Sequence, residues 1–507
     1  MTMNRITSRI LLMTALTGGL ALTEFGCKDL TEQPDFVSPS SFYRNTSDIQ
    51  SALNAAYREL NNEWFNTYYN RSVFDCALGI QTGYEKGPQY YKQGGYAPSD
   101  DYIGTYWAQN YRGINRTNAV IERAPGASMT DAERKAVLAE AKFLRAFYYY
   151  QLFVFFENIP VLDKPTTELG SYQSNEGGKQ KALDLMVADL KAAEADLTAT
   201  ADGSGKPTRW AAKTLLAKVY LENKNYQLAA DKAKEVIDQS GLKLFTEFAN
   251  NFDVANKNKG ERLFEIQQSF LATAGALYNN MHAHFTPSDW DGGDPTALTP
   301  GDNVTAAGWA DAWIVGAIPF RESFDATDKR IPATFMTQYR SKNANGQVVR
   351  YSPTARSPFV APGSPERSFN NVIFNKFIEY NTGGWNRTEK NFVLLRLADA
   401  YLAHSEAVNA GATGDAYMGI NAVRARAGLA PLAGLSKDAL REAIFNEWMK
   451  EFAGEGWAFN HARRFGKTNE LIQKYAGRTV SGDKFRLLPL PFVEVNTNSG
   501  VKQNTGW

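Results

Sequence analysis

The sequence predicts a mainly α-helical protein built on a tetratricopeptide-like scaffold, and three stretches carry this prediction. Within residues 391–464, three consecutive segments repeat apolar side chains every three or four positions, which is the spacing of one apolar helix face. Thr130 and Glu133 form a capping box before a segment that is apolar on most sides, as is typical of a central helix. Residues 208–237 contain two helical segments joined by a short turn, with small and large side chains placed as in a tetratricopeptide repeat.

The N-terminus has the pattern of an export signal. Two arginines precede the apolar run Ile10–Leu22, which is too short to cross a bilayer because a spanning helix needs about 20 residues. Gly26 and Cys27 follow, and we expect Cys27 to be acylated as the first residue of a mature lipoprotein. The alternative is a plain secretory signal with an incidental cysteine. If Cys27 carries lipid, Cys76 has no intramolecular partner.

The rest of the chain alternates helical segments with irregular ones. Helical spacing of apolar side chains predicts further helices over residues 47–60, 111–121 and 179–197. Between Trp64 and Trp107 this spacing fails, and glycines and prolines interrupt the chain, so we expect loops there. Alternating pieces such as Leu263–Gln267 and Val372–Phe377 predict a few short strands in a loop-rich region.

These observations predict a single folded body behind a removable signal. The irregular stretch lies between helical blocks, and such insertions are more often functional elaborations than linkers. The expected parts are a signal peptide at 1–26, a lipid anchor and tether at 27–40, and one body at 41–507, which comprises an N-terminal helical part at 41–260, an irregular ligand-facing insertion at 261–390, and C-terminal helices with a tail at 391–507.

Charge excludes one class of partner. The chain holds 55 basic and 54 acidic residues with no run of one sign, whereas a nucleic-acid partner calls for a basic stripe. Aromatic residues make up 13% of the chain, more than a core requires. Aromatic binding surface is therefore a candidate use for some of them, and core packing is the alternative.

Aromatic side chains on the irregular segments are the candidate ligand contacts. Tyr and Trp offer flat apolar faces to sugar rings, and neighbouring amide, carboxylate and guanidinium groups can bind hydroxyls. Loops over a rigid scaffold are favoured positions for such contacts. The candidates are Tyr84, Tyr90, Tyr91, Tyr96, Trp290, Trp309 and Trp313.

A row of carboxylates raises the question of catalysis. Glu447, Glu451 and Glu455 are four residues apart and lie on one helix face. Paired carboxylates can serve as the acid and base of a glycosidase. Helix-face carboxylates are commonplace, however, and we favour ion pairs with arginines, for which the candidates are Arg424, Arg426, Arg463 and Arg464.

Metal and cofactor motifs are weak or missing in the sequence. His282 and His284 form a possible metal pair without an evident third ligand. Asp289 and Asp291 precede two glycines, yet the Glu that closes an EF-hand loop is lacking. No nucleophile-elbow, phosphate-loop or dinucleotide motif occurs. We therefore expect no metal and no cofactor. The missing motifs leave no catalytic site to propose, and we expect a binding protein that is not an enzyme.

The amino-acid sequences of several predicted helices match those of a known protein family. Five elements closely resemble the sequence signature of the SusD/RagB family. They are Leu395–Asp399, Val423–Gly428, Ala139–Tyr149, the Asp-x-Arg element ending at Arg330, and the glutamate row ending at Glu455. The resemblance implies a structural role for the signature residues Arg396, Asp399, Glu406, Arg424, Arg426, Glu447, Glu451 and Glu455.

The resemblance also implies a function. Members of that family are outer-membrane lipoproteins of Bacteroidetes that face the cell exterior and capture nutrients, mostly glycans, for a SusC-like TonB-dependent transporter. We therefore expect an oligosaccharide-binding lipoprotein that delivers its ligand to such a partner. A peptide-binding member of the same family is one alternative, and a glycoside hydrolase on a helical scaffold is the other.

Overall fold

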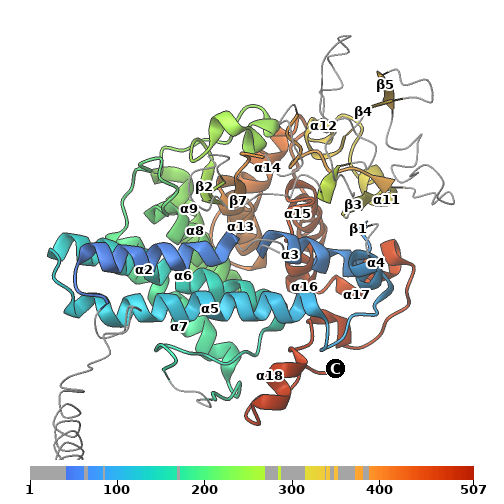
Figure 1. Cartoon of the computed structure of the whole chain (residues 1–507). Helices are drawn as coiled ribbons and strands as arrows, with labels where there is room; N and C mark the ends of the chain where they lie inside the picture. The colour runs from blue at the N-terminus through green and yellow to red at the C-terminus, as the bar shows by residue number, and fades with distance from the viewer. Residues whose placement is uncertain are drawn as a thin grey trace, which may run out of the picture. The chain divides into compact units, whose positions relative to one another are not determined.

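The computed structural model confirms the mainly helical prediction (Figure 1). It describes residues 42–61, 67–83, 86–167, 172–268, 284–286, 314–336, 339–342, 348–351, 371–380 and 388–507. Residues Asn45–Trp507 form one compact unit. No helix among the described residues combines the length and the apolar character that a membrane crossing requires.

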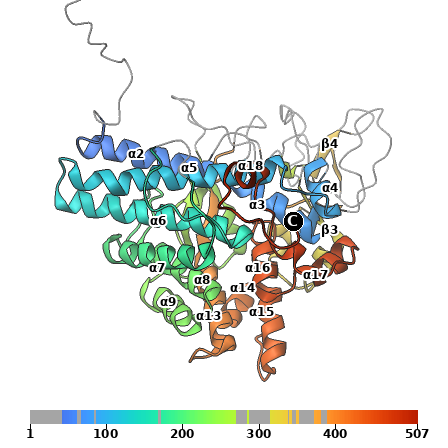
Figure 2. The same cartoon turned by 90° about the horizontal axis from the view of Figure 1, so that it is seen from below.

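The N-terminal helices pack in chain order. α5 contacts α6, α6 contacts α7, α7 contacts α8 and α8 contacts α9, while α2 packs against both α5 and α6. Figure 2 shows this succession from α2 down to α9. The α8–α9 pair is the helical hairpin predicted from the sequence. The helices are α2 (Thr46–Arg58), α3 (Thr67–Asp75), α4 (Lys86–Gln93), α5 (Asp101–Arg123), α6 (Asp131–Phe156), α7 (Gly178–Asp196), α8 (Arg209–Glu222) and α9 (Tyr226–Gln239).

The C-terminal helices continue the same scaffold. α13 packs against α8, α9, α14 and α15, so the chain returns to the N-terminal block after the irregular region. The helices are α13 (Leu397–Ala410), α14 (Ala416–Arg426), α15 (Lys437–Glu451) and α16 (Ala458–Phe465), and four shorter ones are α11 (Ile318–Glu322), α12 (Ile331–Thr334), α17 (Thr468–Leu471) and α18 (Phe492–Thr497).

α6 is the central helix, as its sequence predicts. The Thr130 hydroxyl accepts from the Glu133 backbone N–H, and the Glu133 carboxylate accepts from the Thr130 backbone N–H. Every side chain from Phe143 to Phe156 is buried, on all faces of the helix. Such complete burial stabilises a helix through packing and needs no amphipathic pattern.

Short antiparallel strands accompany the helices. β2 confirms the strand predicted at Leu263–Gln267. It pairs with β7, the strand that directly precedes α13 in the chain. Of the second predicted strand, only Val372 lies in one. The pairs are β2 (Arg262–Ile266) with β7 (Phe392–Arg396), β4 (Tyr339–Lys342) with β5 (Val348–Tyr351), and β3 (Val315–Ala317) with both β1 (Gln81–Thr82) and β6 (Asn371–Val372).

Two local predictions are wrong. Residues 392–396 were expected to begin a helix, but they form β7. The prediction failed because the spacing of apolar residues cannot distinguish a short strand buried on both faces from a buried helix. The expected loops between Trp64 and Trp107 contain α3, α4 and the start of α5. Pro88 does not break α4 because it lies in the first turn, where its missing N–H has no helical partner to lose.

Candidate functional site

The structure buries two of the tyrosines proposed as ligand contacts. Tyr91 and Tyr96 are 0% and 2% exposed, and their rings stack with centroids 4.7 Å apart. The Tyr91 hydroxyl donates to Asp100 at 3.0 Å. These rings belong to the core and offer no face to a ligand, whereas Tyr90 is 43% exposed.

The other predicted contacts lie outside the described residues. They are Tyr84, Trp290, Trp309 and Trp313, together with the lipidation candidate Cys27 and the possible metal ligands His282, Asp289 and Asp291. His284 is described, and its buried ring lies 4.8 Å from that of Tyr69. Within the described parts of the chain, no three His, Cys, Asp or Glu side chains are grouped to hold a metal ion.

The glutamate row is buried and fully engaged in ion pairs. Glu447, Glu451 and Glu455 are each at most 3% exposed. Glu447 pairs with Arg330 at 2.6 Å and with Arg424 at 3.6 Å. Two of the four arginines expected as partners, Arg424 and Arg426, therefore contact this row, and Arg330 was missed.

The middle of the row carries the highest density of charge. Glu451 pairs with Arg330, Arg396 and Arg426. Burial raises the pKa of Glu451, but these three guanidinium groups outweigh burial and hold the pKa far below its usual range. Glu451 is enclosed by arginines and has no exposed surface, so it is not placed to donate a proton to a ligand.

The remaining signature residues also form buried pairs. Lys376 and Arg396 both contact Glu455, at 2.7 and 3.0 Å. Asp399 lies 2.5 Å from Lys218 of α8, and its carboxylate also accepts from the Arg396 backbone N–H. These contacts tie α13 to α8 and α15.

Arg463 and Arg464, the other two arginines expected at the row, point elsewhere. Arg463 pairs with Glu157 and Glu222. Arg464 binds both oxygens of Glu406, at 2.6 and 2.9 Å. The two arginines therefore join α16 to α6, α8 and α13.

A groove between α5 and α18, hereafter the α5–α18 groove, is the best candidate for a ligand site in the described structure. Its volume is 770 Å³, within the range of small-molecule sites. Two aromatic rings at its edge are exposed, Tyr172 by 58% and Phe492 by 55%, and Val493 beside them is 71% exposed. Single exposed apolar residues scattered over a surface need no explanation, but several of them gathered in one concave place indicate a binding surface.

The walls of the groove are fixed by hydrogen bonds. The Trp107 indole N–H donates to Glu494 at 3.4 Å, which ties α5 to α18. The Asn498 side chain donates to the Gln173 carbonyl at 2.9 Å. The Tyr111 hydroxyl donates to the Pro160 carbonyl at 2.7 Å. The site is thereby held in shape before any ligand arrives.

The groove combines the two kinds of groups that sugar recognition requires. Exposed rings offer flat apolar faces, and Asp101, Arg112, Gln173 and Glu494 supply polar groups in the same lining. Sequence reasoning missed Tyr172 and Phe492, which are 320 positions apart in the chain. The only sequence feature near either residue is the pair of prolines, Pro489 and Pro491, before Phe492.

Comparisons with known proteins agree with this architecture. The profile of the SusD family matches residues 309–507, and the profile described as "Starch-binding associating with outer membrane" matches residues 30–221. SusD-like protein P2 of Formosa agariphila is 28% identical over 515 residues, with 96% of this chain and 97% of that protein covered. Starch-binding protein SusD of Bacteroides thetaiotaomicron is 24% identical over 452 residues, with 78% and 76% covered.

A solved structure described as a laminarin-binding SusD-like protein superposes with a TM-score of 0.74 at 25% identity, covering 92% of this chain and all of that one. Fold and sequence together define a helical-repeat protein of a glycan-binding class. The chain belongs to the SusD/RagB family, whose members occur in Bacteroidetes.

Proposed function

We propose that this protein is a cell-surface lipoprotein that captures an oligosaccharide in the α5–α18 groove and passes it, uncut, to a SusC-like TonB-dependent transporter. The observation that carries the proposal is the pair of exposed rings, Tyr172 and Phe492, on a preformed groove with polar walls. The laminarin-binding and starch-binding relatives support a glucan as the first ligand to test.

The buried glutamate row supports binding over hydrolysis. A retaining or inverting glycosidase needs two carboxyl groups that reach the substrate. Glu447, Glu451 and Glu455 are instead enclosed and paired with cations. The fold also offers the helical surface that would dock onto the transporter, and Cys27 would supply the lipid that holds the protein at the outer membrane.

The test measures retention of the full-length mature protein in gels that contain laminarin or starch. Tyr172→Ala and Phe492→Ala should each weaken retention about tenfold, the loss expected when one stacking ring is removed from a site. Leu228→Ala is the matched control, because Leu228 is 45% exposed but lies on α9, outside the groove. It should leave retention unchanged.

Three results would contradict the proposal in different ways. If all three variants were retained as strongly as the wild type, the groove would not be the ligand site. Steady release of reducing ends from either glucan would indicate a hydrolase. A Cys27→Ser variant that stays in the outer-membrane fraction would show that no lipid at this position anchors the protein.

A further inference from the structure

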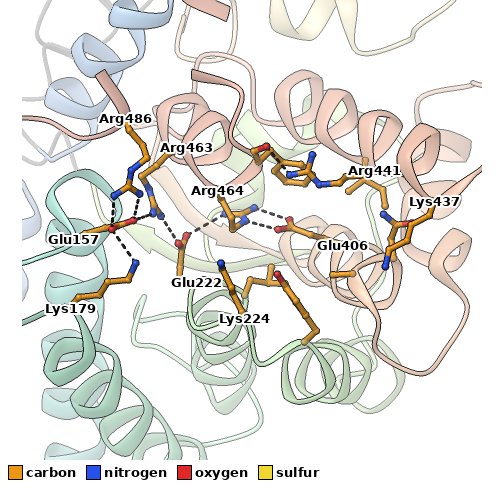
Figure 3. Close-up of a pocket in the computed structure, with 16 residues that line it drawn as sticks. Glu157, Lys179, Glu222, Lys224, Glu406, Lys437, Arg441, Arg463, Arg464 and Arg486 are labelled. Carbon is orange, nitrogen blue, oxygen red and sulfur yellow. Dashed lines mark hydrogen bonds and ion pairs between the residues drawn. The ribbon is translucent and has the colours of Figure 1, made fainter. Parts of the chain in front are cut away.

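A second cavity, distinct from the α5–α18 groove, lies where α6, α8, α13, α15 and α16 meet (Figure 3). Its volume is 420 Å³, far more than the roughly 10–15 Å³ that one water requires. Seven cationic side chains and three carboxylates line it, a formal excess of four positive charges. The whole chain carries a net charge of only +1, so this cavity concentrates positive charge.

The three carboxylates are already saturated by part of this charge. Glu157 pairs with Arg463 at 2.6 Å, with Arg486 at 2.7 Å and with Lys179 at 3.1 Å. The other two carboxylates, Glu222 and Glu406, share Arg464, whose guanidinium lies 3.5 Å from Glu222 and 2.6 Å from Glu406. Every carboxylate of the lining is therefore held by cations of the lining.

Three cations of the lining remain without a carboxylate. Among the described residues, no ion pair joins Lys224, Lys437 or Arg441 to an acidic side chain, and all three are exposed residues at the mouth of the cavity. The Arg441 guanidinium donates to the Phe465 backbone carbonyl at 2.7 Å and lies over the Phe465 ring, 5.1 Å from its centroid, so its remaining N–H groups are not used by a carboxylate. In Figure 3, Lys224 lies below Arg464 while Lys437 lies beyond Glu406, and all three cations line the same cavity.

The backbone is strained where it presents Lys224. This residue follows α8 with φ +57°; its own N–H donates to the Leu221 carbonyl at 3.1 Å, and the Asn225 N–H donates to the Tyr220 carbonyl at 2.9 Å. That is the helix-ending position at which glycine is preferred, because a left-handed conformation costs other residues roughly 1–2 kcal/mol. Strain of this kind at a lysine that lines a cavity makes its side chain a candidate for a ligand contact.

Glu157, which also lines the cavity, shows the same feature. Its φ is +54°, and the Asn158 N–H bonds to the Phe156 carbonyl at 2.7 Å, which makes Glu157 the centre of a rare, strained γ-turn. Two of the four non-glycine residues with positive φ in the described structure thus line this cavity. Strained residues concentrate at ligand sites because the surrounding structure must aim particular side chains.

We propose that this cavity binds a sulfate or phosphate oxyanion through Lys224, Lys437 and Arg441. The group can be a free ion or a substituent on a larger molecule, since the cavity has room for more than the ion itself. Lysine and arginine form charge-assisted hydrogen bonds to such oxygens. The inference is independent of the glycan proposal, because none of these residues lines the α5–α18 groove.

The test is calorimetric titration of the full-length mature protein with sodium sulfate, inorganic phosphate, galactose 6-sulfate and galactose at constant ionic strength. Sulfate or phosphate binding assigns the free ion, and binding of galactose 6-sulfate alone assigns a substituent. Arg441→Gln should weaken whichever anion binds about tenfold, the loss expected for one charge-assisted hydrogen bond. Lys191→Gln removes one charge from the exposed face of α7 and should leave binding unchanged.

Lys224→Gly separates binding from folding. It should relieve the left-handed strain and raise the melting temperature, yet weaken anion binding about tenfold. Unchanged anion affinity in both Lys224→Gly and Arg441→Gln would overturn the proposal. So would the absence of heat with sulfate, phosphate and the sulfated sugar alike, or an equal response to galactose.

Discussion

Arg330 and Glu447 lie 117 positions apart in the chain, and their charged groups meet at 2.6 Å in a fully buried contact. The same guanidinium binds Asp328 at 2.7 Å and Glu451 at 2.9 Å. The short Asp-x-Arg element before α12 therefore locks onto α15. Arg330 serves three carboxylates at once, and its loss would leave all three buried without that partner.

Arg330→Leu should destabilise the protein by about 3–5 kcal/mol, because removing one partner of a buried ion pair leaves uncompensated charge behind. Urea unfolding of the variant measures this loss. Arg424→Leu is the control on the same glutamate: Arg424 is 20% exposed and lies 3.6 Å from Glu447, so about 1 kcal/mol or less is expected. Similar losses in the two variants would contradict the central role of Arg330.

Glu157 should make stability depend on pH. Burial raises its pKa, but the hydrogen bond to Arg486 and the charges of Arg463, Arg486 and Lys179 outweigh burial and lower the pKa to about 2 in the folded chain. Because the folded pKa lies below the ordinary value of 4.5, the stabilisation is complete above pH 4.5 and is lost as the pH falls from 4.5 toward 2.

The measurement for Glu157 is the free energy of unfolding of the wild type and of Glu157→Gln between pH 7 and pH 2.5. The difference should be largest, roughly 3 kcal/mol, above pH 4.5 and shrink below it. Glu442→Gln changes a carboxylate that is 44% exposed and should show a small difference at every pH. A difference for Glu157→Gln that does not vary with pH would show that its charge is not what stabilises the fold.

Local rules in the sequence predict the helices of this protein well, because spacing and capping act within a few residues. The capping box at Thr130 and the stripes after it place α6 without reference to the rest of the chain. The same rules fail at α4. Gly87 there is required by close packing, since a Cβ would lie 2.5 Å from the Tyr102 ring, and not by a turn.

Long-range features could not be predicted in the same way. The glutamate row was recognised as a set of ion pairs, but nothing in the local sequence identifies Arg330 as its main partner. The α5–α18 groove depends on Tyr172 and Phe492, which meet only once the tail has folded back onto α5. The cationic cavity draws on five helices, so its excess charge is invisible in a chain that is nearly neutral overall.

Cys76 should be inert in the native protein. It is buried, and burial followed by the charge of Asp75 raises the pKa of its thiol well above the usual value. Thiolate is the reactive form, so iodoacetamide should modify Cys76 only after unfolding in urea. Peptide mass mapping locates the label. Stoichiometric labelling of Cys76 in the folded protein would contradict its enclosed position.

Two glycines in helices should respond in opposite directions to the same substitution. A Cβ on Gly419 would lie 1.8 Å from the Tyr401 carbonyl oxygen, because α14 crosses α13 there at backbone contact. Gly419→Ala must push the helices apart, and we expect a loss of about 3 kcal/mol or more. A Cβ on Gly104 in α5 meets nothing within 4 Å, so Gly104→Ala should gain roughly 0.5–1 kcal/mol from reduced backbone freedom in the unfolded chain. Thermal unfolding of both variants tests the two expectations. A stable Gly419→Ala would show that α13 and α14 are not packed as closely as this contact requires. A destabilised Gly104→Ala would show that another group packs against that face of α5.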